Sequence, residues 1–263
     1  MNPLEALIRP ELFRFSLELT RIAGLIAMAP LAWALAPVRF RVALALVLAV
    51  MVHGANLGDT PGPVFANEID AALAVCTELV LGFIFGFVIR LAVTLGEVVG
   101  EVVTPAMGLG AAQIFDPLSQ VTHGVITTLL RHFCLLIALL VGLHRVALGG
   151  LVHSFRVLPV GGLYDPARAW PSLLAISAEL LNCGVRIALP ILAVLFISNL
   201  ALAFVARAAP QIQVFSVGFA FTLGVGVLIL VLILPDIAYQ MGADFSHVGG
   251  RLEQVFDDMG ASP

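Results

Sequence analysis

The sequence predicts an all-α, multi-pass integral membrane protein. Hydrophobic residues make up 60% of the 263 residues and charged residues only 11%, and the mean hydropathy is +1.07. A soluble domain carries roughly a quarter charged residues, so a chain this apolar is typical of a bilayer protein. Several apolar runs are also long enough to cross a bilayer as helices, which takes about 20 residues.

Apolar runs of this length can be placed in six positions along the chain. They lie at residues 15–36, 40–57, 71–95, 125–143, 173–205 and 212–236. Short links rich in proline, glycine or polar residues join them, one of which runs from His144 to Pro171. The tail from Gly242 to Pro263 is polar enough to be solvated and can frame a short helix. Since no repeat and no separable soluble part is evident, we expect residues 1–263 to form a single membrane domain.

Composition and motifs argue against several classes of function. The net charge is −4, whereas nucleic-acid binding requires a basic face. Cys76, Cys134 and Cys183 lie singly in apolar segments, which predicts small buried side chains and not metal ligands or disulfides. The six histidines form no HExxH pair, and the chain has no GxSxG motif and no phosphate-binding loop. We therefore predict a protein that is not an enzyme and has no metal or cofactor site.

The loop from Thr104 to Gly124, TPAMGLGAAQIFDPLSQVTHG, is unusually apolar for a connection between helices. Gly108 and Gly110 permit tight or left-handed backbone. Asp116-Pro117 is typical of a turn followed by a new helix. The apolar side chains of the loop are Met107, Leu109, Ile114, Phe115 and Leu118. Because a solvated loop should be polar, we expect this one to pack against protein or enter a cavity; an ordinary hydrophobic connection is the alternative.

Four prolines are predicted to end or interrupt helices. Pro105 lacks an N–H and disfavours helical backbone at the residue before it, so it should stop the helix that arrives from the N-terminal side. Pro190, Pro210 and Pro235 interrupt otherwise spanning helices. The carbonyl groups freed there need partners, so we expect these positions to lie against protein and not lipid.

Two sets of polar residues fall on single helix faces within the apolar segments. Their members are three or four residues apart, so each set forms a stripe. The stripes are Arg90, Thr94, Glu97 and Glu101, and then Glu179, Asn182 and Arg186. A charge at mid-bilayer costs roughly 2.5–3.5 kcal/mol, so such residues face protein or water. One interpretation is a polar conduit or a surface for partner helices; the other is ion pairing that only holds the bundle together.

Two pairs of glycines are spaced for close helix contact. Gly82 with Gly86, and Gly96 with Gly100, each place small residues four positions apart. Such pairs let the backbones of neighbouring helices approach closely.

Three motifs together resemble one family. They are GLGAAQIFDP at 108–117, HSFRVLPVGG at 153–162 and RAAPQIQVFSVGF at 207–219. The chain resembles the FliR family of flagellar export-gate proteins and its type III secretion relatives of the SctT group, over nearly its whole length. The Arg-x-x-Pro-Gln stretch is the most specific element, and HSFRVLPVGG favours the flagellar branch over the injectisome branch. One departure is Ala220-Phe221, where the family often has Gly-Phe-Pro-Leu.

The resemblance implies a structural part of a protein export gate. FliR-like proteins assemble with FliP and FliQ homologues into a pore for unfolded flagellar proteins, and an FlhB homologue contacts that gate. The implied location is the bacterial inner membrane at the flagellar basal body, and some of the apolar segments are expected to be bent hairpins and not simple crossings. A secondary transporter using Arg90, Glu97 and Arg186 is the alternative, but the two related halves typical of transporters are not evident.

The resemblance also assigns candidate functional residues. The loop matching 104–124 is implied to plug the closed gate, through Met107, Gly108, Gly110, Gln113, Ile114, Phe115, Asp116 and Pro117. An apolar plug can seal a pore by contact and dewetting. Polar contacts for assembly are assigned to Arg90, Glu97, Glu101, Glu179, Asn182, Arg186, Arg207, Pro210 and Gln211. Among these, Arg207 and Gln211 are expected to satisfy backbone groups near Pro210 or on a partner subunit.

Overall fold

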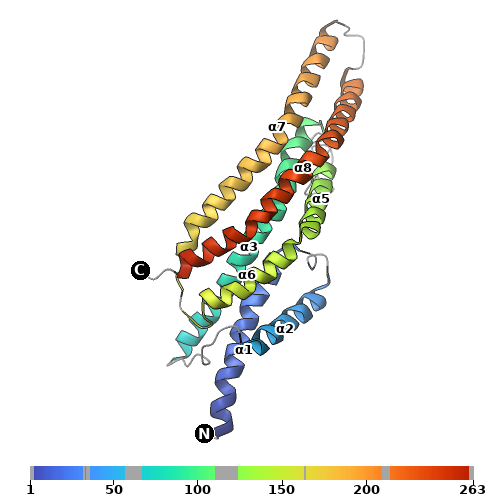
Figure 1. Cartoon of the computed structure of the whole chain (residues 1–263). Helices are drawn as coiled ribbons and strands as arrows, with labels where there is room; N and C mark the ends of the chain where they lie inside the picture. Colours follow the sequence, from blue (N-terminus) through green and yellow to red (C-terminus); the bar gives the residue numbers. More distant parts are fainter. Residues whose placement is uncertain are drawn as a thin grey trace. The chain divides into compact units, whose positions relative to one another are not determined.

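The regular structure of the chain is helical, as predicted (Figure 1). The computed structural model describes residues 3–31, 33, 36–56, 67–109, 124–162, 164–208 and 214–260. Its helices are α1 (Pro3–Met28), α2 (Val38–Gly54), α3 (Glu68–Ala106), α5 (Val125–Val141), α6 (Leu143–Val157), the 3-10 helix η2 (Pro166–Ala169), α7 (Trp170–Ala208) and α8 (Val214–Gly260). The predicted apolar runs correspond in order to α1, α2, α3, α5, α7 and α8.

The helices differ in their capacity to cross a membrane. Within the described residues, three are long and apolar enough, at Glu68–Ala106, Pro166–Ala208 and Gly218–Gly260, and the bent pair of α5 and α6 makes a fourth if it counts as one span. Helix α2 has only 17 residues. The apolar part of α1 carries Arg14, Glu18 and Arg21. The apolar segments are thus helices of the predicted kind, but they are not equivalent crossings.

The long helices exceed the thickness of a bilayer. Helices α3 and α7 have 39 residues each and α8 has 47. At about 1.5 Å per residue, even the shorter two extend roughly 58 Å, against about 30 Å for the hydrocarbon core of a bilayer. Each of these helices therefore continues well beyond a single crossing.

Residues 144–171 are not the link that the sequence predicts, because most of them form α6 and η2. Helix α6 is amphipathic, with buried positions three or four residues apart. They are Leu143, Ala147, Leu151, Ser154 and Phe155. Gly142 has φ +88°, a left-handed conformation that breaks the helix between α5 and α6, and the two helices are bent by 65° there.

The C-terminal tail is also not a separate short helix. Helix α8 continues without a break to Gly260, which corrects the prediction of a solvated tail from Gly242 onward. Its last part buries apolar side chains at helical spacing, namely Phe245, Val248, Leu252, Val255, Phe256 and Met259. Burial of this face explains why the helix persists despite the polar residues on its other face.

The four prolines differ in their relation to the helix ends. Pro105 lies inside the last turn of α3, which ends one residue after it, at Ala106. Pro190 lies inside α7 and Pro235 inside α8, so neither ends a helix. Pro210 lies outside the described residues.

One compact unit of the chain comprises Met1–Ala92, Leu139–Ser177 and Phe245–Pro263. In this unit α2 packs against α1. The rings of Phe85 on α3 and Phe256 on α8 meet edge to face with centroids 5.5 Å apart. A Cβ atom at Gly150 of α6 would lie 3.1 Å from the ring of Phe85. The core of this unit is therefore shared by α3, α6 and the end of α8.

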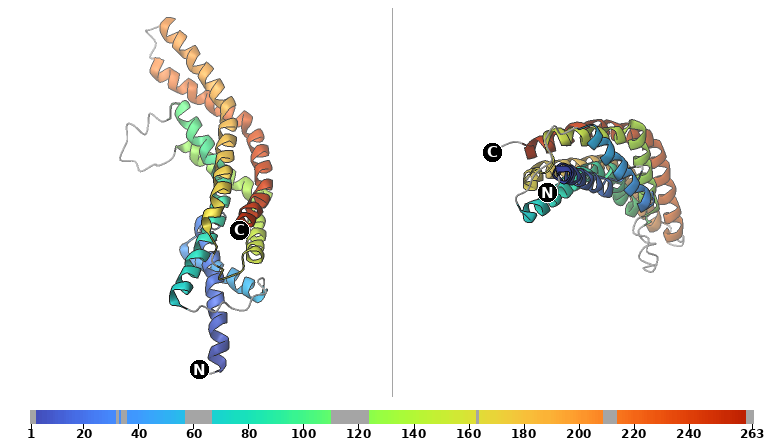
Figure 2. Two further views of the ribbon diagram at one scale, coloured as in Figure 1. Left: turned by 90° about the vertical axis from the view of Figure 1, so that its left-hand side faces the viewer. Right: turned by 90° about the horizontal axis from the view of Figure 1, so that it is seen from below.

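The second unit comprises Val93–Ala138 and Ala178–Asp244. Here α7 and α8 lie side by side (Figure 2). The Cys183 thiol on α7 donates a hydrogen bond of 2.9 Å to the Asp244 carboxylate on α8. Cys134 is buried as predicted, whereas Cys76, in the first unit, is exposed. Helices α3, α7 and α8 contribute to both units, and a single domain over residues 1–263 stays a prediction.

Candidate functional site

A polar cluster in the first unit is centred on a buried ion pair between α1 and α3. Arg21 is 1% exposed and Glu78 is 0% exposed. The Arg21 guanidinium donates through Nε to Glu78 Oε2 at 2.5 Å and through Nη2 to Glu78 Oε1 at 3.0 Å. Two parallel charge-assisted bonds of this kind are stronger and more directional than a single contact.

Close packing of glycines places the two charges within reach of each other. A Cβ atom at Gly82 of α3 would overlap the carbonyl oxygen of Arg21 and lie 3.1 Å from the Cα atom of Gly24 on α1. One turn further along, a Cβ atom at Gly86 would lie 2.9 Å from the carbonyl oxygen of Leu25. The Gly82/Gly86 pair thus brings α3 against α1, as its spacing predicts, and Glu78 lies one turn before this contact.

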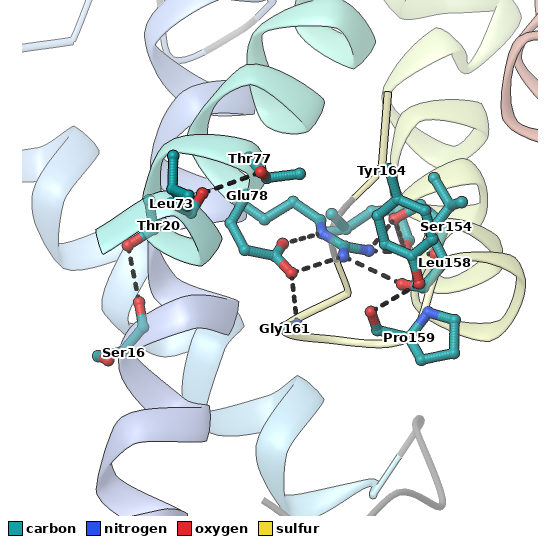
Figure 3. Close-up of polar contacts among 12 residues, drawn as sticks. Ser16, Thr20, Leu73, Thr77, Glu78, Ser154, Leu158, Pro159, Gly161 and Tyr164 are labelled. Atoms are coloured by element: carbon teal, nitrogen blue, oxygen red, sulfur yellow. Dashed lines mark hydrogen bonds and ion pairs between the residues drawn. The ribbon is translucent and has the colours of Figure 1, made fainter. Parts of the chain in front are cut away.

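The same ion pair binds the end of α6. Arg21 Nη1 donates to the carbonyl oxygen of Ser154 at 3.1 Å, and Arg21 Nη2 donates to that of Leu158 at 3.0 Å. The backbone N–H of Gly161 donates to Glu78 Oε1 at 3.0 Å. Figure 3 shows Glu78 beside Gly161, with Ser154 and Leu158 on the opposite side of the cluster. The Ser154 carbonyl also accepts the N–H of Leu158, which caps α6, so Arg21 adds a second donor there from another helix. A positive charge is favourable at a helix C-terminus.

Aromatic side chains surround this cluster. The Arg21 guanidinium carbon lies 4.5 Å from the centroid of the Phe155 ring, a cation–π distance. The Tyr164 hydroxyl donates to the carbonyl oxygen of Pro159 at 2.9 Å. Burial raises the pKa of Tyr164, and the positive charge of Arg21 only partly opposes this shift. Tyr164 therefore keeps the proton that it donates to Pro159.

A second buried carboxylate lies nearby on α1. Glu18, which is 1% exposed, accepts from Arg14 Nε at 3.0 Å and lies 3.0 Å from His53 Nδ1 on α2. The ring of His53 also meets that of Phe15 edge to face. Glu18 thus joins α2 to α1 in the same way as Glu78 joins α3 to α1.

In the second unit, the predicted stripe of α3 faces α5 only in part. Glu97 pairs with Arg131 of α5 at 3.1 Å, and their side chains are 25% and 48% exposed. A Cβ atom at Gly96 would lie 2.5 Å from the carbonyl oxygen of Leu130, and one at Gly100 would overlap Thr127. The Gly96/Gly100 pair therefore packs α5 on α3, while the partly exposed ion pair contributes little to stability.

The first residues of the predicted plug are described and packed. Met107 is 0% exposed and occupies the space that a side chain at Gly226 of α8 would take. Gly108 has φ +81°, and a Cβ atom there would lie 3.4 Å from the ring of Phe219. The other predicted plug residues, Gly110, Gln113, Ile114, Phe115, Asp116 and Pro117, lie outside the described residues.

The remaining predicted assembly residues lie at the surface of the chain where they are described. These exposed side chains are Arg90 and Glu101 on α3, and Glu179, Asn182, Arg186 and Arg207 on α7. Arg207 lies in the last turn of its helix. Pro210 and Gln211 lie outside the described residues. The structure therefore keeps both polar stripes on continuous helices, α3 and α7.

The sequence interpretation missed Arg21, Glu78, Glu18 and His53. A signal was present, because Arg21 and Glu78 are opposite charges in two different apolar runs, where an unpaired charge is costly. In the described part of the chain, no group of three or more His, Cys, Asp or Glu side chains could hold a metal ion. The cluster around Arg21 is thus suited to holding helices together.

Comparison with known proteins places the whole of this cluster within one family. A family model described as bacterial export proteins, family 1, matches residues 12–248. The flagellar biosynthetic protein FliR of Escherichia coli (strain K12) is 28% identical over 242 residues, which covers 92% of both chains. FliR of Pectobacterium carotovorum subsp. carotovorum is 33% identical over 156 residues, 59% of this chain and 60% of that one. FliR of Aquifex aeolicus (strain VF5) is 34% identical over 138 residues, 52% of this chain and 53% of that one.

The family model includes Arg21, Glu78 and the HSFRVLPVGG segment, and it extends over most of the apolar helices described above. All three of these relatives carry the name flagellar biosynthetic protein FliR. The chain therefore belongs to the bacterial export proteins of family 1, the family of the flagellar biosynthetic protein FliR.

Proposed function

We propose that the chain is a structural component of the flagellar type III protein export gate. With FliP and FliQ homologues it forms the pore for unfolded flagellar proteins, in the bacterial inner membrane at the flagellar basal body. An FlhB homologue contacts this assembly, and the chain itself catalyses no reaction. The observation that carries the proposal is the family match over residues 12–248, together with FliR relatives named as flagellar biosynthetic proteins.

The surface of α7 and α8 supports a role as one wall of a larger assembly. Large apolar side chains are exposed along both helices, among them Phe196, Ile197, Phe204, Leu228, Val231 and Leu232. Large apolar side chains exposed in this number are normally covered by lipid or by another protein. This surface is suited to a membrane-embedded wall that lipid or neighbouring subunits cover.

Polar residues interrupt this apolar surface and favour protein neighbours over lipid. Glu179, Asn182 and Arg186 are exposed on α7, in the same stretch as the exposed Leu181 and Val185. An ionised group that faces the middle of a bilayer costs roughly 2.5–3.5 kcal/mol, and polar groups on a partner helix would offset that cost for Arg186. We assign assembly contacts to the two polar stripes and to the Arg207–Gln211 region on this basis.

The plug is proposed for Met107 to Leu118. Its support is the packing of Met107 against Gly226 and the left-handed turn at Gly108, which fix where this segment leaves α3. The apolar residues that follow are suited to filling a dry constriction. In this proposal the plug leaves the pore when an exported polypeptide enters.

The function is tested by deleting the gene in its host and measuring the flagellar proteins exported to the medium. Export should stop in the deletion strain and return when the chain is supplied from a plasmid. Thr77→Val is the control variant, and it should accumulate like the parent chain. The Thr77 hydroxyl bonds only within its own helix, to the carbonyl oxygen of Leu73. Undiminished export in the deletion strain would contradict the proposal, and so would uptake of a small solute by the isolated chain.

A further inference from the structure

The five residues that follow α6, Leu158 to Gly162, cross over the Arg21–Glu78 pair; we call this segment the strap. Leu158 is 0% exposed and Val160 is 7% exposed. Gly161 has φ +82°, which turns the chain so that its N–H meets Glu78. The strap therefore contacts the buried charges through its backbone and buries two of its own side chains.

The polar groups of the strap and of the ion pair satisfy one another. Arg21 donates to Glu78 through Nε and Nη2, and to the carbonyl groups of Ser154 and Leu158 through Nη1 and Nη2. Glu78 Oε1 accepts from Gly161 as well as from Arg21. A buried donor or acceptor that loses its partner costs about 1–3 kcal/mol, and more when it is charged. Opening the strap would therefore leave unmet groups on both sides of the contact.

Tyr164 also contacts the strap, at Pro159 and Gly162. Its hydroxyl donates to Pro159, and a Cβ atom at Gly162 would lie 2.5 Å from its ring. Figure 3 shows Tyr164 beside Pro159. The strap is thus bound both by the Arg21–Glu78 pair and by the Tyr164 side chain.

We propose that the strap is a latch that closes only when α1, α3 and α6 are in their native register. Arg21 comes from α1 and Glu78 from α3, while the carbonyl groups come from the end of α6 and the strap itself. A shift of any one of these helices by a single turn, about 5.4 Å, would separate charge from countercharge or from the carbonyl groups. The ion pair therefore does more than join α1 to α3. Its other hydrogen bonds, from Arg21 to two carbonyl groups and from Gly161 to Glu78, also hold the end of α6 and the strap.

The latch is tested by the accessibility of a cysteine in place of Val160. The three native cysteines are first replaced, and Val160→Cys is labelled with a maleimide in the full-length chain, purified in mild detergent together with whatever proteins accompany it. Val160 is buried, so labelling reports opening of the strap. Arg21→Lys keeps the positive charge but loses the planar fork that serves carboxylate and carbonyl groups together, and Glu78→Gln keeps the shape but removes the countercharge.

Both variants should raise the labelling rate by roughly tenfold or more, since each removes at least one charge-assisted hydrogen bond from the closed state. Thr20→Val and Thr77→Val are matched controls one residue away from each charge, and their hydroxyls bond only within their own helices, to Ser16 and Leu73. These controls should label at the parent rate. Parent-rate labelling in Arg21→Lys and Glu78→Gln would overturn the latch and show that packing alone holds the strap.

A further variant covers the case in which a charge variant does not accumulate. Tyr164→Phe leaves both buried charges in place and removes only the bond to Pro159. Its labelling rate should rise less than tenfold but measurably above that of the parent. Parent-rate labelling in Tyr164→Phe, when the charge variants do not accumulate, would also overturn the latch. None of these readouts depends on export, so the latch and the proposed function can fail separately.

Discussion

Gly82 on α3 lies so close to Arg21 on α1 that a Cβ atom at position 82 would overlap the Arg21 carbonyl oxygen. The side chain of the same Arg21 makes a two-pronged ion pair with Glu78, one turn before Gly82. Backbone contact and ion pair are therefore two parts of one helix crossing. This relationship makes the crossing sensitive both to side-chain volume and to charge.

Gly82→Ala should destabilise the chain by about 1–3 kcal/mol, because the added methyl group forces two backbones apart. Gly149→Ala is the matched control, since a Cβ atom at Gly149 of α6 meets nothing within 4 Å. Alanine in an open helical position should stabilise by roughly 0.5–1 kcal/mol. Thermal unfolding of the purified variants in detergent measures both, and equal shifts in the two variants would contradict the packing described for Gly82.

Removing one member of the buried pair, in Arg21→Met or Glu78→Met, should destabilise by about 3–5 kcal/mol, because the other charge stays buried without compensation. The double variant Arg21→Met/Glu78→Met should recover only part of this loss. It still leaves the carbonyl group of Leu158 and the N–H of Gly161 without their side-chain partners, while the Ser154 carbonyl keeps only the N–H of Leu158. Denaturant unfolding of all four proteins gives the coupling energy, and a double variant as stable as the parent would show that the backbone contacts contribute little.

Much of the fold follows from apolar periodicity, and the exceptions have physical causes. The runs at 71–95 and 173–205 were recognised as helices because they are long and predominantly apolar, and they became parts of α3 and α7. Helix α6 was not predicted because Gly149-Gly150 and the polar residues near them resemble a link between helices. The overlooked signal is the helical spacing of Leu143, Ala147 and Leu151. The C-terminal part of α8 was not predicted as a continuous helix because its polar residues resemble a solvated tail. Its apolar face is buried by neighbouring helices, which the sequence alone does not identify.

The sequence predicts that buried ion pairs exist, but it does not predict which residues form them. Arg14, Glu18, Arg21 and Glu78 are all charges in or near apolar runs, so a sequence alone indicates that some of them pair. It does not indicate that Glu18 pairs with Arg14 and His53 while Glu78 pairs with Arg21. That choice depends on the close approach of α1 and α3 at Gly82, which brings together Arg21 and Glu78, 57 residues apart in the sequence.

Deleting residues 108–117 should leave the complex assembled and make it permeable to ions. The deletion removes the apolar residues proposed to seal the pore and keeps Met107, which is buried against α8. Conductance of the purified complex in planar bilayers measures the leak, with the full-length complex at equal abundance as the control. A deletion complex that seals as tightly as the parent would refute the plug.

Arg207→Ala should reduce the amount of FliP homologue that co-purifies with the chain, because Arg207 is exposed at the end of α7 and is proposed to contact a partner. Arg39→Ala is the matched control, since Arg39 is exposed in the first turn of α2 and has no proposed role in assembly. Quantitative mass spectrometry of affinity-purified material measures the ratio of partner to chain. Equal ratios in both variants would remove Arg207 from the assembly contacts.

The central claim is that this apolar chain is one subunit of a flagellar export pore. The most direct measurement is purification of the tagged chain from its own host in mild detergent, followed by identification of the proteins that accompany it. The account predicts a stable complex that contains the FliP and FliQ homologues. A chain that purifies alone, or with neither homologue, while the host still exports flagellar proteins would contradict it.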